Sequence, residues 1–141
     1  MSHHTRGRKA EPQPVADPIR RVPTPPRDMT AEAKTEWRRC LPVLIERRVL
    51  STADLHACER FCEAVGDIRI ARAAIATDGA YVPNRLGELK RHPAWATLRE
   101  ATAESRRWAA ELGISPASRG RVKNGDEDDG DSLMDYERGA D

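Results

Sequence analysis

Apolar residues recur at helical spacing in three stretches of the chain, and the first stretch follows Thr30. Thr30 is a residue type that caps helix starts, and Glu32 then places a negative charge in the first turn. Spacings of four, three and one residues put the apolar side chains Trp37, Leu41, Leu44 and Ile45 on one helix face. Pro42 removes a backbone donor and crowds the preceding turn, so we expect the helix to bend or restart near Cys40 rather than run straight to Val49.

The second stretch predicts a long helix from about residue 52 to residue 77. Ser51 with Asp54 three positions on is close to a capping box, which marks a helix start. The apolar stripe that follows consists mostly of Leu55, Cys58, Cys62, Val65, Ile68, Arg72 and Ile75, with Phe61 beside it. At 1.5 Å per residue this helix is roughly 39 Å long. The other helices of so small a domain cannot cover a helix of this length, so we expect part of it to pack on another subunit.

The third stretch predicts a helix that begins near Pro93 and closes at Gly113. Before it, Tyr81 and Val82 lie between turn-forming residues, which permits a short hairpin between the second and third helices. One face of the third helix carries Trp95, Leu98, Thr102, Ser105, Trp108, Ala109 and Leu112. Ser115 then caps a further short helix. The predicted fold class is mainly α: a small helical bundle with long antiparallel helices, a short β-hairpin between the second and third helices, and disordered ends.

Composition indicates a thin core. The 141 residues amount to one domain, and 38% of them are hydrophobic but only 4% aromatic. The side chains expected in the core or in contacts between subunits are Trp37, Leu55, Cys58, Cys62, Val65, Trp95, Leu98, Trp108 and Leu112. A core of this kind leaves apolar surface uncovered in a monomer, which favours a homo-oligomer. No apolar run reaches the roughly 20 residues that span a bilayer, so we expect a protein of the cytoplasm without membrane contact.

Charge divides the chain into three segments. Residues 1–28 hold six Lys or Arg, three acids and six prolines, which predicts a disordered basic arm. Residues 29–122 are the predicted helical domain and hold 16 basic and 12 acidic residues. Residues 123–141 hold two basic and eight acidic residues, which predicts a disordered acidic tail.

The chain offers little catalytic or metal-binding chemistry. Cys58 and Cys62 are one helical turn apart, but they lie on an apolar stripe, where cysteine is more often a small hydrophobic side chain than a zinc ligand. No carboxylate pair sits in an apolar run that would shift its pKa, and no Gly-x-x-x-x-Gly-Lys-Ser/Thr loop is present. We therefore expect no enzyme activity, no cofactor and no bound metal.

Basic residues point to a nucleic acid. Each one alone is more often a solvated helix flank, but residues 29–122 carry four more basic than acidic residues (16 minus 12), and an oligomer multiplies that excess. Aromatic residues are too few for a platform that stacks single strands, so duplex DNA is the favoured ligand. The residues expected to contact DNA are Arg6, Arg8, Lys9, Arg20, Arg21, Arg38, Arg39, Arg47 and Arg48.

Five landmarks between residues 29 and 122 resemble the phage terminase small subunit. They are Thr30–Ala33 followed by Trp37, Leu50–Asp54, the Gly79 turn with Tyr81, His92–Ala94, and a closing motif with Gly113, Ser115, Pro116, Ser118 and Arg119. The resemblance implies a DNA-packaging factor without catalytic activity, which recognises the viral genome and assembles as a ring in the host cell. It also implies a large-subunit partner that carries the ATPase and the nuclease.

Two other classes of protein fit parts of the sequence. Residues 47–51 between two helices are compatible with a helix-turn-helix transcription regulator, although the second predicted helix is longer and more apolar than a recognition helix. A helical adaptor that binds only protein is the other alternative, with its charges as solvated faces. Neither alternative accounts for the order of the five landmarks.

Overall fold

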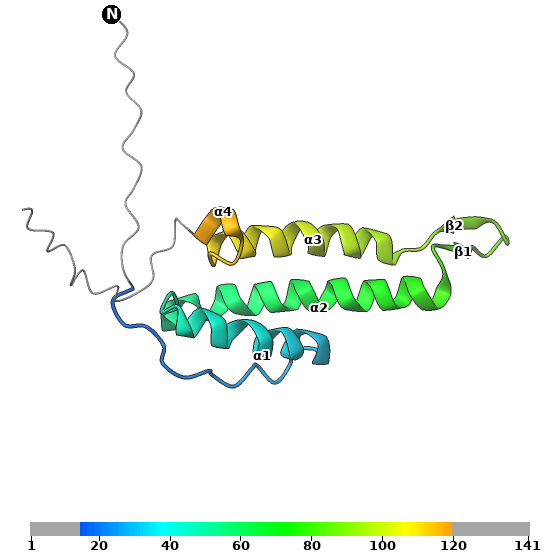
Figure 1. The fold of residues 1–141 in the computed structure, drawn as a ribbon. Helices are drawn as coiled ribbons and strands as arrows, with labels where there is room; N and C mark the ends of the chain where they lie inside the picture. The colour runs from blue at the N-terminus through cyan, green and yellow to red at the C-terminus, as the bar shows by residue number, and fades with distance from the viewer. Residues whose placement is uncertain (1–14, 120–141) are drawn as a thin grey trace, which may run out of the picture.

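The computed structural model describes residues 15–119, which form a mainly helical protein (Figure 1). The elements are α1 (Ala31–Glu46), the 3-10 turn η1 (Thr52–Asp54), α2 (Leu55–Asp78), β1 (Tyr81–Pro83), β2 (Leu89–Arg91), α3 (Ala94–Glu111) and α4 (Pro116–Arg119). Helices α2 and α3 run antiparallel beside each other, with the two strands at their far end, and α1 packs along the first half of α2. The predicted fold class, including the hairpin, is confirmed.

Helix α1 runs through Pro42 without a restart, and it ends at Glu46. Of the two outcomes expected near Cys40, a bend or a restart, the restart is therefore wrong. Pro42 is exposed, so its ring projects away from the core, while the buried Leu41 and Leu44 on either side hold the helix against its neighbours. Packing of the apolar face outweighs the loss of one backbone hydrogen bond.

An arginine in the left-handed conformation ends α1. Arg48 has φ 52°, and its N–H donates to the Ile45 carbonyl at 2.9 Å, while the Val49 N–H donates to the Leu44 carbonyl at 3.3 Å. This is the Schellman arrangement, which usually places glycine at the left-handed position. It turns the buried Val49 and Leu50 into the core.

We expect Arg48→Gly to be more stable than Arg48→Ala by about 1 kcal/mol, because alanine keeps the Cβ that disfavours positive φ. Arg48 makes a further interaction, so the comparison uses two variants that both lack its guanidinium group. Urea unfolding at equal protein concentration measures the difference. Equal stability, or a more stable alanine variant, would show that the backbone relaxes out of the left-handed region.

The other predicted helix ends are confirmed. The Ser51 N–H and hydroxyl both donate to Asp54 Oδ2 at 2.7 Å, which completes the capping box before α2. Gly113 closes α3 with φ 67°, and the Ile114 N–H donates back to the Ala109 carbonyl at 2.9 Å. Ile114 also packs against the core, as the closing motif requires.

The core lies at one end of the molecule, where α1, the first half of α2 and the end of α3 meet. Its largest fully buried side chains include Trp37, Leu41 and Leu44. The helices cross closely here, since a Cβ on Gly66 would lie 2.9 Å from the Ala33 nitrogen. Of the predicted core residues, Trp37, Cys58, Cys62 and Leu112 are buried, and Leu55, Val65 and Trp108 pack against them.

The far half of the α2–α3 pair has little core of its own. Trp95 and Leu98 are only half-buried, because α1 does not extend to this half of the molecule. In the hairpin, Tyr81 pairs with Arg91, and Asn84 Oδ1 closes the turn by accepting from the Leu86 and Glu88 N–H groups at 2.9 Å. The apolar hairpin side chains are exposed: Tyr81 by 62%, Leu86 by 83% and Leu89 by 73%.

Candidate nucleic-acid interface

The segment before α1 lies along that helix in the opposite direction. The Ile19 N–H donates to the Leu50 carbonyl at 2.8 Å, just past the C-terminal end of α1. Further along, the Trp37 indole N–H donates to the Pro23 carbonyl at 2.9 Å. The predicted basic arm lacks helix and strand over its described residues, as its prolines require, but from Ile19 onward it is bonded to the helical body. Part of the segment predicted as a disordered arm is thus placed against α1.

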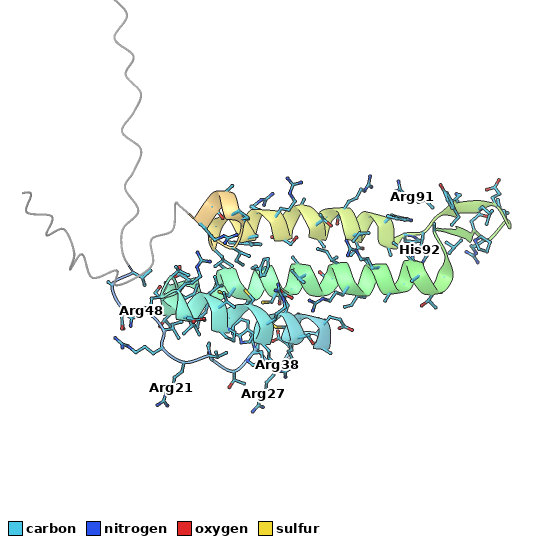
Figure 2. All side chains as sticks on the ribbon, in the orientation of Figure 1. Arg21, Arg27, Arg38, Arg48, Arg91 and His92 are labelled. Carbon is cyan, nitrogen blue, oxygen red and sulfur yellow. The ribbon has the colours of Figure 1, made fainter. Side chains whose placement is uncertain are left out.

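Exposed arginines from the segment and from α1 share one side of the molecule. Figure 2 shows Arg21, Arg27 and Arg38 on the side of α1 that faces away from α2 and α3, and Arg48 at the end of the molecule where α1 ends. Arg20 is also exposed, and it borders the same small pocket as Arg48. We call Arg20, Arg21, Arg27, Arg38 and Arg48 the outer basic face. Residues separated by up to 28 positions in the chain are thereby gathered on one surface.

The outer basic face suits a polyanion better than a small ligand. Guanidinium groups present several N–H donors that match phosphate oxygens, and exposed arginines can follow a phosphate backbone. Helix α1 alone extends about 24 Å, which is the length of several base pairs. Glu46 also borders the pocket beside Arg20 and Arg48, so this end of the face is less positive than the rest.

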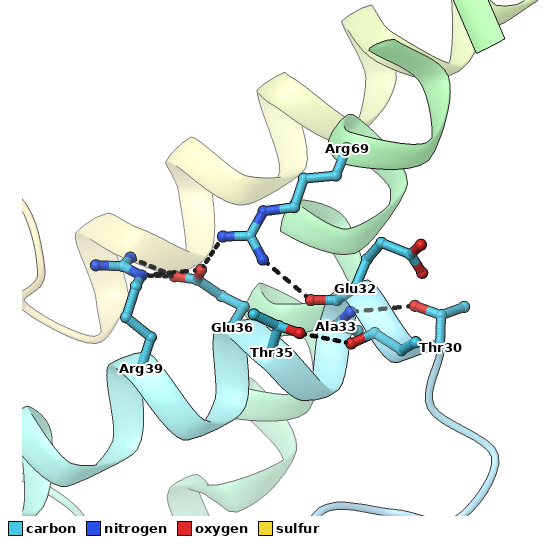
Figure 3. A network of polar contacts seen from close by, with 8 residues as sticks. Thr30, Glu32, Ala33, Thr35, Glu36, Arg39 and Arg69 are labelled. Carbon is cyan, nitrogen blue, oxygen red and sulfur yellow. Dashed lines mark hydrogen bonds and ion pairs between the residues drawn. The ribbon is translucent and has the colours of Figure 1, made fainter. Parts of the chain in front are cut away.

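Arg39 is exposed, but it pairs with a buried carboxylate in a polar network between α1 and α2 (Figure 3). Glu36 is fully buried, and its carboxylate accepts from Arg39 on α1 and, at 2.7 Å, from Arg69 on α2. The hydrogen bond with Glu36 and its negative charge raise the pKa of the Arg39 guanidinium. Arg69 also donates to the Glu32 carbonyl at 3.1 Å. Two arginines therefore compensate the burial of the Glu36 carboxylate.

Arg47 joins two helix ends. Its side chain is half-buried and donates to the Gly113 carbonyl at 3.1 Å, 66 positions along the chain. Of the predicted DNA contacts, Arg20, Arg21, Arg38 and Arg48 thus share the outer basic face, and Arg39 and Arg47 do not. Arg6, Arg8 and Lys9 lie outside the described residues. Arg27 was not among the residues expected to contact DNA. The Lys34 ammonium of α1 donates to the Arg27 carbonyl at 2.8 Å, and this bond holds Arg27 beside α1.

The junction between hairpin and α3 carries a second basic group. The Arg91 guanidinium lies 4.8 Å from the centre of the Trp95 ring, a cation–π contact. His92 accepts from the Ala94 N–H through Nδ1 at 3.0 Å and lies 3.2 Å from Asp78, so it fixes the start of α3. Both residues lie at the opposite end of the molecule from the core (Figure 2).

The three cysteines are core residues. Burial raises the pKa of Cys40 to about 11 and of Cys58 to about 12, and it also raises the pKa of Cys62. The thiols are therefore protonated at neutral pH, whereas a metal ligand is a thiolate. Within residues 15–119, no three His, Cys, Asp or Glu side chains are grouped to hold a metal ion. None of the helices in that range combines the length and apolarity that a membrane crossing needs.

Comparison with known proteins gives one family. A family model described as "Phage terminase, small subunit" matches residues 33–129, which includes all of α2 and α3 and most of α1. No curated protein and no solved structure matches the chain significantly.

Proposed function

Because the chain belongs to the phage terminase small-subunit family, we propose that it is the DNA-binding subunit of a viral genome-packaging motor. In this role it binds viral double-stranded DNA as a homo-oligomeric ring and delivers the DNA to the large subunit. The large subunit supplies the ATPase and nuclease activities in the host cell.

The outer basic face is the observation that supports DNA binding most directly. Its arginines are exposed and lie on a single surface, and backbone phosphates are the anions that such a surface fits over the length of a helix. Base-specific contacts are not part of this proposal. The alternative of a helix-turn-helix regulator is disfavoured, because α2 has 24 residues and packs against both α1 and α3.

Replacing Arg21, Arg27 and Arg38 together by glutamine should weaken duplex binding. The slope of log K against log salt concentration should become shallower by about three, roughly one for each phosphate that is no longer neutralised. Fluorescence anisotropy with a labelled duplex at several salt concentrations measures both the affinity and the slope.

The matched control replaces Arg72, Arg99 and Arg106 by glutamine. These exposed residues of α2 and α3 lie outside the outer basic face, and the change in net charge is the same. Equal reductions in affinity for the two triple variants would mean that net charge alone drives binding. Absence of duplex binding by the unaltered protein at low salt would favour the protein-only adaptor instead.

The protein should form a homo-oligomer larger than a dimer. The far half of the α2–α3 pair exposes apolar side chains at Ile70, Tyr81, Leu86 and Leu89, and a two-stranded hairpin is marginal without further packing. Light scattering after size-exclusion chromatography measures the mass, and Leu86→Ser with Leu89→Ser should lower it. A monomer at micromolar concentration would contradict the ring.

A further inference from the structure

A pocket of about 310 Å³ opens between α1, the turn after α3, and α4. Three arginines stand around it, and the remaining lining is apolar. The lining residues are Arg39, Cys40, Val43, Leu44, Arg47, Ile114 and Arg119. None of these residues belongs to the outer basic face, so the pocket is a separate site.

Over the part of the chain that the structure describes, the pocket has an excess of positive charge. Within residues 15–119, no acidic side chain lines it, and only Arg39 of the three arginines is paired with a carboxylate. That carboxylate, Glu36, is shared with Arg69, so it cannot neutralise Arg39 fully. Arg47 has a carbonyl partner, which carries no net charge. Beside these groups, Val43 leaves 53% of its surface exposed. The site therefore fits a segment that combines acidic and apolar side chains.

Such a segment follows in the same chain. Residues 126–129 are Asp-Glu-Asp-Asp, and the apolar Leu133, Met134 and Tyr136 come soon after. Arg119 lines the pocket itself, and seven residues span at most about 25 Å, so residue 126 is within reach of the site. We propose that residues 126–136 bind in this pocket of their own chain, with the carboxylates on the arginines and the apolar side chains against Val43 and Ile114.

This docking would oppose DNA binding, a consequence that rests on the proposed function. A bound acidic segment neutralises arginines near the duplex site and repels phosphates by its surplus charge. Replacing Asp126, Glu127, Asp128 and Asp129 by their amides should therefore raise duplex affinity at low salt. Unchanged duplex affinity would contradict the claim that the docked segment opposes DNA binding.

Docking itself is tested without DNA, by carbodiimide coupling of carboxylates to a lysine placed in the pocket. In the full-length Arg47→Lys variant, a peptide containing residue 47 should couple to tail carboxylates and be identified by mass spectrometry. Lys34 and Lys90 are the matched internal controls, since both lie on described elements outside the pocket. The coupling should disappear when residues 126–129 are converted to amides, and at about 0.5 M salt, where charges are strongly screened.

Val43→Lys provides a second position at the rim of the pocket and keeps the bond from Arg47 to the Gly113 carbonyl. Coupling at residues 47 and 43 no stronger than at Lys34 and Lys90 would overturn the proposal. A mixture of isotopically labelled and unlabelled protein shows whether the coupled tail comes from the same chain or from a second copy. Coupled peptides of mixed label would mean that a second copy supplies the tail, which also overturns docking within one chain. If no variant binds DNA but the coupling is found, the proposed function fails and the docking stands.

Discussion

Replacing Trp37 by alanine should lower the free energy of unfolding by about 3–5 kcal/mol, the usual cost of emptying a large buried position. Trp37 is 1% exposed and lies at the centre of the core. Its indole N–H also donates to the Pro23 carbonyl, so the variant loses one of the bonds that fasten the preceding segment to α1. Chemical unfolding followed by circular dichroism measures the change.

Two further variants separate packing from attachment. Trp37→Phe keeps an aromatic ring but removes the indole N–H, so it should cost less stability and still weaken duplex binding, because Arg21 and Arg27 are then less firmly placed beside Arg38. Trp95→Ala is the matched control for size, and it should cost less than Trp37→Ala because Trp95 is half-buried. A Trp95 variant as damaging as the Trp37 variant would contradict the assignment of the core to one end.

Replacing both Arg39 and Arg69 by methionine should destabilise the protein by about 3–5 kcal/mol, because it leaves the buried Glu36 carboxylate without a positive partner. Each single variant should cost much less, since the other arginine still binds the carboxylate. The cost of the pair should therefore exceed the sum of the single costs. Thermal and urea unfolding of the four proteins give this coupling.

Adding Glu36→Met to the double variant should restore most of the lost stability. An apolar side chain of similar length fills the same space without a charge to compensate, and an apolar set often replaces a buried ionic one without destabilising the fold. The rescue distinguishes an unpaired charge from weaker packing by the arginine side chains. A triple variant as unstable as the double variant would show that packing was responsible.

Local chemistry in the sequence was enough to predict most of the helices and turns. The capping box of Ser51 and Asp54, the closure at Gly113 and the hairpin before α3 depend on residues a few positions apart, so their backbone geometry follows from neighbouring side chains. The periodic apolar positions also identified the core faces of α1 and α2. The family resemblance drew on the same local landmarks, and the family match includes α2, α3 and most of α1.

The features that could not be predicted from the sequence depend on contacts between residues that are distant in the chain. Periodicity treats Glu36 and Arg47 as helix-surface charges, yet tertiary packing buries Glu36 against Arg69 and directs Arg47 to the Gly113 carbonyl. Proline content predicts that the segment before α1 lacks regular structure, but bonds to distant residues, such as the one from Trp37 to Pro23, decide where it lies and which arginines become neighbours. The helical elements follow from local signals in the sequence. Which charges reach the surface together depends on burial and on partners from distant parts of the chain, and these follow only from the whole fold.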